Sequence, residues 1–173
     1  MAVAVFGGGC FWCTEAVFKR LRGVNQVLPG YCGGHIENPS YTQVKEKTTG
    51  HIEVIKIDFN PEEISYATLL EVFFNTHDPT TLDRQGYDEG PQYASAIFYQ
   101  NQEQAQLAHQ AIAEQQENFT APIVTKILPA ATFWTAEEYH HDFFDRNPEQ
   151  GYCSLVISQK VAKFMQKYAD KLK

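Results

Sequence analysis

The sequence predicts a single domain of the α/β (α+β) class, a two-layer sandwich in which helices flank a mixed β-sheet. Its length of 173 residues is typical of one domain, which we take to span residues 1–173. Its residues are 43% hydrophobic and 20% charged, which is enough apolar material for a sizeable core. Segments with strand periodicity alternate with segments of helical periodicity, and several are joined too tightly for parallel crossovers. The sheet is therefore expected to be mixed.

The first half of the chain contains three predicted strands and two predicted helices. They are a strand at Ala2–Phe6, a helix from Cys10 to a stop at Gly23, strands at Val24–Tyr31 and His51–Phe59, and a helix over Ser65–Asn75. The three glycines before Cys10 form a turn, because glycine adopts conformations closed to other residues. Pro29 is expected to weaken the end of the second strand. Gly33–Ser40, rich in Gly, Asn and Pro, is expected to be a loop.

The second half adds strands and a helical tail. We expect a loop at Pro79–Gln92, a strand at Tyr93–Tyr99, a helix from Asn101 to about Asn118 and a strand at Ile123–Leu128. Thr135 and Glu138 have capping-box spacing, which predicts the start of a helix. After a turn at Asn147–Gly151, apolar residues at helical spacing predict a last helix: Ile157, Val161, Phe164, Met165, Tyr168 and Leu172. The predicted order is βαββαβαβαα.

Charge and hydropathy exclude several classes of partner. The chain has 14 Lys and Arg against 21 Asp and Glu, a net charge of −7, and no cluster of basic residues. Nucleic acids and anionic membranes are therefore not expected as partners. The longest wholly apolar run, Ala2–Phe6, is too short to cross a membrane and does not form a signal-peptide core. We expect a cytoplasmic protein.

The four cysteines are Cys10, Cys13, Cys32 and Cys153. One Cys-x-x-Cys pair with a distant cysteine favours redox chemistry or a metal site over a disulfide scaffold. A zinc site needs four ligands in sensible pairs, and only Cys10 and Cys13 are paired. We therefore expect no metal and no cofactor. A zinc-dependent structural module and a thiol–disulfide oxidoreductase using Cys10 and Cys13 are the alternatives.

Cys10 and Glu53 are the strongest candidates for chemistry. Cys10 lies where a glycine turn becomes a helix, and the helix dipole and free amides there are expected to lower a thiol pKa. A buried structural cysteine is the alternative. Period-two alternation places Glu53 on the same strand face as Ile55 and Ile57, where burial raises a carboxyl pKa and suits a general acid. The alternative is a Glu53 at the sheet edge, reaching water.

Three further polar residues lie in or beside predicted loops. They are Tyr41, Asp88 and Tyr93. Tyrosines in such positions are usually core residues. Their hydroxyls can also donate hydrogen bonds to a substrate oxygen.

The segment Gly9-Cys10-Phe11-Trp12-Cys13-Thr14-Glu15 resembles the peptide methionine sulfoxide reductase A family. The resemblance continues along nearly the whole chain. It includes Gly30-Tyr31-Cys32-Gly33-Gly34, Asn38-Pro39-Ser40-Tyr41, Gly50-His51-Ile52-Glu53-Val54, Asp78-Pro79-Thr80, Gly90-Pro91-Gln92-Tyr93-Ala94-Ser95, Glu138-Tyr139-His140, Asn147-Pro148 and Gly151-Tyr152-Cys153. The first segment together with Gly-His-x-Glu-Val is specific.

The resemblance implies roles for individual residues. Cys10 matches the family's nucleophile and Glu53 its acid. Tyr41 and Tyr93 match its two tyrosines that bind the sulfoxide oxygen. In the substrate pocket, Asp88 matches the family's aspartate, and Phe11 and Trp12 match the pair that receives the S-methyl group.

The resemblance also implies the reaction and its partner. Cys10 attacks the sulfur of methionine sulfoxide, free or in a protein, and becomes a sulfenic acid. A second thiol forms a disulfide with it, and thioredoxin reduces that disulfide. The S epimer is the implied substrate.

Cys153 is the expected resolving thiol. It follows a turn-forming stretch that is expected to be mobile, and it matches the family's Gly-Tyr-Cys near the chain end. Cys13 is tied to the same stiff helical turn as Cys10, and Cys32 lies at a strand end. The family often has Gly at position 13 and Ala at position 32, so Cys13 and Cys32 remain possible secondary thiols.

Overall fold

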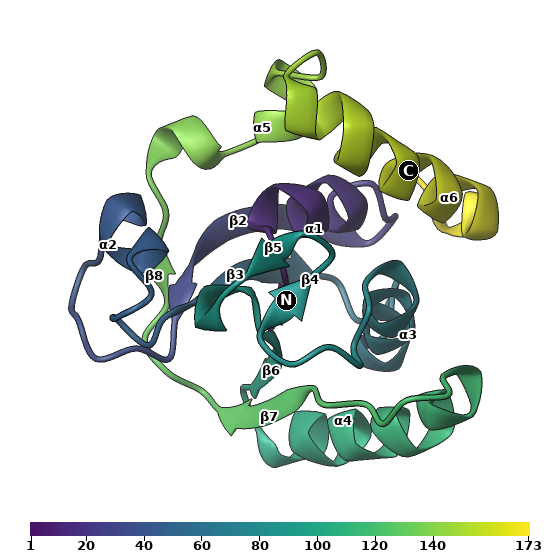
Figure 1. The fold of residues 1–173 in the computed structure, drawn as a ribbon. Helices are drawn as coiled ribbons and strands as arrows, with labels where there is room; N and C mark the ends of the chain where they lie inside the picture. The colour runs from purple at the N-terminus through teal and green to yellow at the C-terminus, as the bar shows by residue number, and fades with distance from the viewer.

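The structure is a computed structural model that describes residues 1–153 and 155–173. Its centre is a six-stranded sheet in the order β7-β6-β1-β3-β2-β8 (Figure 1). These strands are β1 (Ala2–Gly8), β2 (Val24–Cys32), β3 (Ile52–Phe59), β6 (Ser95–Tyr99), β7 (Lys126–Pro129) and β8 (Trp134–Thr135). Only β6 and β7 pair in parallel, and the other neighbours are antiparallel. The mixed sheet is confirmed.

Helices and short turns connect the strands. The α-helices are α1 (Phe11–Phe18), α2 (Tyr41–Lys45), α3 (Tyr66–Thr76), α4 (Gln102–Gln115), α5 (Phe143–Arg146) and α6 (Ser158–Lys167). A π-helical turn, Cys153–Ile157, leads into α6, and 3₁₀ turns occupy Pro91–Tyr93, Gln116–Asn118, Glu138–His140 and Ala169–Lys171. Ser40, Ser65 and Asn101 cap α2, α3 and α4 by accepting hydrogen bonds from backbone amides. A separate hairpin consists of β4 (Arg84–Gln85) and β5 (Asp88–Glu89).

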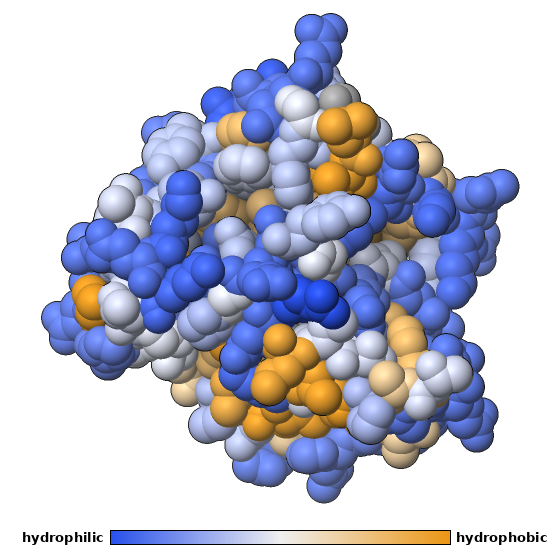
Figure 2. Space-filling view, in the orientation of Figure 1, coloured by the Kyte–Doolittle hydropathy of each residue, from blue (hydrophilic) through white to orange (hydrophobic). Residues whose placement is uncertain are grey.

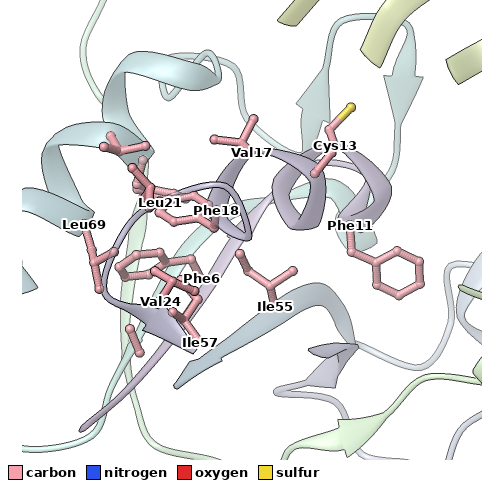
Figure 3. Packing of buried hydrophobic residues seen from close by; sticks show 14 of the residues in the cluster. Phe6, Phe11, Cys13, Val17, Phe18, Leu21, Val24, Ile55, Ile57 and Leu69 are labelled. Carbon is pink, nitrogen blue, oxygen red and sulfur yellow. The ribbon is translucent and has the colours of Figure 1, made fainter. Parts of the chain in front are cut away.

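Alternation along β3 divides the interior into two clusters on opposite faces of the sheet. Ile55 and Ile57 join the larger cluster with residues of α1, α3 and α6, whereas Ile52 and Val54 belong to a smaller cluster. Figure 3 shows the larger cluster, in which side chains from α1 meet those of β1 and β3. The helices therefore cover one face, and the two-layer architecture is confirmed. In Figure 1, α6 (yellow) lies across α1 (purple), and these two helices contact each other.

Several boundaries differ from the sequence expectation. The first helix ends at Phe18 rather than at Gly23. Strand β2 continues through Pro29 to Cys32. The Pro29 carbonyl accepts a hydrogen bond from Ala136 N–H, just past the end of the short strand β8. The Pro29 nitrogen points to the same side, so its missing N–H does not interrupt the pairing of β2 with β3. The predicted strand at Ile123–Leu128 begins only at Lys126. The short helix α2 was not predicted.

The capping-box prediction was wrong. Thr135 lies in strand β8, paired with Gly30, and the 3₁₀ turn that follows has Glu137 at its N-cap, where no side chain caps it. Strand pairing across the sheet outweighed a local helix signal. The segment after β8 therefore forms only the short 3₁₀ turn Glu138–His140 beside the sheet edge, and not an α-helix.

The C-terminal helix is confirmed, with a different start. Backbone hydrogen bonding is already helical at Gly151, so Cys153 lies inside the helix and not in the turn before it. The apolar stripe is buried at Ile157, Val161, Phe164 and Tyr168, whereas Met165 is exposed. Within the described residues, no helix is both long enough and apolar enough to span a bilayer.

Candidate active site

Cys10 lies at the junction of β1 and α1, as its place after three glycines indicates. Gly9 has a positive φ of 91°, and a Cβ there would lie 2.7 Å from Gln85 of the hairpin. Only glycine therefore allows the hairpin to approach this closely. Cys10 is the N-cap residue of α1 and is partly exposed. Because part of this residue reaches the surface, Cys10 lies where a substrate can approach it.

Glu53 is buried beside the start of the same helix. Its strand, β3, is central in the sheet, so the edge alternative is wrong. Glu53 is 1% exposed, and its Oε1 accepts a hydrogen bond of 3.1 Å from the backbone N–H of Phe11. Burial raises the pKa of Glu53 to about 8; the charge of Asp88 adds to this, and the Phe11 amide opposes it. The carboxyl is therefore mainly protonated at neutral pH.

The pKa of the Cys10 thiol is raised, contrary to the sequence expectation. Burial is the largest cause, followed by the negative charges of Glu53 and Cys13. The backbone amide of Trp12 at the helix start acts in the opposite direction but is outweighed. The sequence showed the helix start but not the desolvation and the carboxyl that tertiary packing adds.

Tyr41 and Tyr93 come from different elements to the same place. Tyr41 is the first residue of α2, and Tyr93 ends the 3₁₀ turn before β6. Burial raises the pKa of both hydroxyls, and the charges of Glu53 and Cys10 raise each of them further. Both tyrosines thus remain hydrogen-bond donors close to the thiol and the carboxyl.

Asp88 belongs to the hairpin and faces the tail. Its carboxylate accepts a hydrogen bond of 2.7 Å from the Tyr152 hydroxyl. The charge of Asp88 contributes to the raised pKa values of Cys10, Glu53 and Tyr41. Tyr152 was not predicted as a site residue, although the resemblance includes the segment that contains it.

Phe11 and Trp12 form part of an aromatic cluster beside Cys10. Phe11 is buried, and its ring centroid lies 5.7 Å from that of Tyr31 and 6.4 Å from that of Tyr41. Trp12 stacks on Phe143, with centroids 3.8 Å apart and planes at 5°. In Figure 3, Phe11 points away from the Phe6 and Phe18 rings of the main core. The cluster is an apolar wall of the kind that a methyl group can contact.

His140 and Glu137 are two residues of this site that the sequence reasoning missed. His140 is 0% exposed, and its Nδ1 accepts a hydrogen bond of 3.0 Å from the Trp12 indole N–H. Burial lowers the pKa of His140 to about 4, so the ring is neutral. Glu137 accepts hydrogen bonds of 2.8 Å from the Tyr31 hydroxyl and from the Tyr41 backbone N–H. The sequence pointed to this region only through the family segment Glu138-Tyr139-His140, which does not indicate which residues His140 contacts in space.

The other thiols are not equally placed. Cys13 Sγ lies 4.0 Å from the Tyr152 hydroxyl, and Cys153 is fully buried in the larger cluster. Cys32 belongs to the smaller cluster on the opposite face of the sheet and contacts the carbonyl of Ala131. All four cysteines are free. Among the described residues, no group of His, Cys, Asp and Glu side chains is arranged to hold a metal ion.

An α/β fold that sets a partly exposed cysteine beside a buried, protonated carboxyl is the arrangement expected of an enzyme with a thiol nucleophile. Residues 2–173 match the family described as peptide methionine sulfoxide reductase. The peptide methionine sulfoxide reductase MsrA of Saccharolobus solfataricus is 53% identical over 173 residues, which cover 100% of this chain and 98% of that protein. The chain therefore belongs to the peptide methionine sulfoxide reductase family, and it is an enzyme that reduces methionine sulfoxide.

Solved structures agree with this assignment. Mxr1 from Saccharomyces cerevisiae in reduced form superimposes with a TM-score of 0.81 at 31% identity, covering 88% of each chain. Mxr1 has also been solved in complex with Trx2. That structure matches with a TM-score of 0.57 at 23% identity and covers 82% of this chain and 84% of the other.

Proposed function

We propose that the enzyme reduces the S epimer of methionine sulfoxide, free or in proteins, through a sulfenic acid on Cys10. The observation that carries the proposal is the buried Glu53 carboxyl, held by the Phe11 amide next to the cysteine at the N-cap position of the same helix. A thiol–disulfide oxidoreductase using Cys10 and Cys13 has no need for this acid. Reduction of a methyl sulfoxide with dithiothreitol as the only reductant tests the proposal without a protein partner.

In the proposed reaction, the oxygen moves from the substrate to Cys10. The Cys10 sulfur attacks the sulfoxide sulfur while Glu53 donates its proton to the sulfoxide oxygen. The hydroxyl then passes to the Cys10 sulfur as the sulfur–oxygen bond of the substrate and the new sulfur–sulfur bond break, and methionine leaves. The thiol proton of Cys10 returns to Glu53, so one thiol and one sulfoxide give one sulfenic acid and one thioether.

The remaining residues are assigned to binding. Tyr41 and Tyr93 donate hydrogen bonds to the sulfoxide oxygen as it gains negative charge. Phe11 and Trp12 receive the S-methyl group, and Asp88 with its Tyr152 partner closes the pocket on the hairpin side. A polar oxygen and an apolar methyl on one sulfur require both kinds of surface, and this arrangement supplies them.

Cys153 is proposed to resolve the sulfenic acid, with thioredoxin as the reductant of the resulting disulfide. The thioredoxin proposal comes from the family resemblance and accords with the solved complex of Mxr1 with Trx2. Because Cys153 is 0% exposed within a helix, the segment around residues 151–157 must unwind before its sulfur meets Cys10. Single π-helical turns are rare and are frequently found at functional sites, which supports a role for this turn in the change.

Cys153→Ser is expected to reduce about one sulfoxide per enzyme in a burst and then to lose thioredoxin-supported turnover. The reason is that Cys10 still forms the sulfenic acid but no disulfide follows. Rapid-quench measurement of methionine formed per enzyme checks this. Cys32→Ser, on the opposite sheet face, and Cys13→Ser should keep turnover. A Cys10–Cys13 or Cys10–Cys32 disulfide in the peptide map of the oxidised enzyme contradicts the assignment.

His140→Phe is expected to weaken substrate binding and the fold. Phenylalanine keeps an aromatic ring at this position, but the partly buried Trp12 indole N–H loses its acceptor, and a donor left unsatisfied away from water costs about 1–3 kcal/mol. The free energy of unfolding should fall by that amount, and KM for methionine sulfoxide should rise more than kcat falls. His109→Phe, at an exposed position of α4, is the control. An unchanged KM in His140→Phe contradicts the positioning of Trp12.

We infer that the enzyme works in the cytoplasm in the repair of oxidised methionine. Four free thiols, two of them close to the tail, are suited to a reducing compartment. Fractionation of cells that express the protein, with detection by antibody, tests the location.

A further inference from the structure

A groove of about 440 Å³ separates the β4–β5 hairpin from the C-terminal helix. Asp88 and Tyr152 are among its lining residues, and their side chains are joined by a hydrogen bond of 2.7 Å. The Tyr152 hydroxyl also lies 4.0 Å from Cys13 Sγ, and its ring centroid lies 6.1 Å from that of Trp12. The groove therefore adjoins the wall of the candidate active site.

Two large side chains stand exposed on the two sides of this groove. Tyr87, at the tip of the hairpin, is 100% exposed, and Leu155, at the start of the C-terminal helix, is 71% exposed. Figure 2 shows hydrophobic residues at the surface along the start of this helix, above the hairpin. Single exposed apolar residues are common, but two that face one groove beside an active site form a contact surface for an extended chain.

The groove also carries basic side chains, although the protein has a net charge of −7. Lys160 and Lys163 line it, and within residues 1–153 and 155–173 neither lysine forms an ion pair. Of the two acidic residues that line the groove, Asp88 already binds Tyr152, and Asp78 accepts hydrogen bonds from Thr80. The same two lysines also line an adjacent cavity of about 620 Å³, where Lys167 joins them.

We propose that this groove binds the polypeptide next to an oxidised methionine, and that Lys160 and Lys163 select substrates with acidic side chains there. The inference rests on the proposed function and names its substrate class. Tyr87 and Leu155 hold the substrate polypeptide by apolar contact. Lys160 and Lys163 attract the carboxylate of a residue next to the oxidised methionine, a group that free methionine sulfoxide lacks.

The test compares three sulfoxides with dithiothreitol as reductant. They are N-acetylmethionine amide sulfoxide and two blocked peptides in which methionine sulfoxide is flanked by Asp or by Lys. The wild-type enzyme is expected to prefer the acidic peptide by about tenfold in kcat/KM, the size of one or two solvent-screened charge contacts. Because exposed charges are screened over about 8 Å at physiological ionic strength, the preference should fall as salt is added.

The double variant Lys160→Glu, Lys163→Glu is expected to lose or invert this preference and to keep activity on the small sulfoxide within about twofold. Lys171→Glu, Lys173→Glu makes the same charge change at the chain end and should keep the preference. An unchanged preference in the groove variant overturns the inference. So does a variant that loses only thioredoxin-supported turnover, because the lysines then serve the reductant. Failure of the wild type on the small sulfoxide refutes the proposed function itself, whereas loss of peptide selectivity alone does not.

Discussion

Replacing Cys10 by serine is expected to abolish sulfoxide reduction while the protein stays folded. The hydroxyl is a far weaker nucleophile than the thiol, and the neighbouring Glu53 carboxyl is mainly protonated at neutral pH and cannot activate it. Cys10 is partly exposed at the helix N-cap, and its side chain caps no backbone amide, so the fold loses little. The measurement is methionine formed from the small sulfoxide with dithiothreitol.

Cys32→Ser is the matched control for this experiment. It makes the same atomic change at a cysteine in the smaller cluster, on the other face of the sheet. Circular dichroism and the unfolding midpoint of both variants separate loss of chemistry from loss of structure. Appreciable dithiothreitol-driven activity in the Cys10 variant contradicts the nucleophile assignment.

Glu53→Gln is expected to slow the reductive step by roughly 10²–10⁴, the usual contribution of a positioned general acid. Glutamine keeps the shape and can still accept from the Phe11 amide, but it has no proton to transfer. A single-turnover rate of methionine formation isolates this step. Glu15→Gln is the control, because Glu15 is also a buried carboxyl with a raised pKa, of about 7, and accepts from Asp142 N–H outside the site.

The pH dependence of the same rate gives a second readout. Burial raises the pKa of Glu53 to about 8, so its acid form is present below that pH and is lost above it. The wild-type reductive step is therefore expected to slow as the pH rises through about 8, and this decline should be absent in Glu53→Gln. A variant within about threefold of the wild-type rate, with the same pH profile, contradicts the acid role.

Much of the fold was predictable from local pattern because periodicity reports burial. The alternation of Glu53, Ile55 and Ile57 placed a carboxyl on the apolar face of β3, and the structure puts it there, 1% exposed. Errors arose where distant pairing outweighed a local signal. Thr135 lies in strand β8 because it pairs with Gly30 of β2. Pro29 remains within β2 because its nitrogen faces the side on which β8 has already ended.

The sequence by itself determined the class of this protein. Cys10 follows three glycines, of which Gly9 has a positive φ of 91°, and the ordered family segments span nearly the whole chain. Tertiary structure alone decided the electrostatics of the site and the accessibility of the thiols. Desolvation and the nearby carboxyls of Glu53 and Asp88 reverse the pKa shift that the helix start suggested for Cys10. Cys153 is fully buried within a helix, and His140 meets Trp12 across 128 positions of sequence. The pKa shifts, burial and long-range contacts depend on which residues are neighbours in space, and a local sequence pattern does not contain that information.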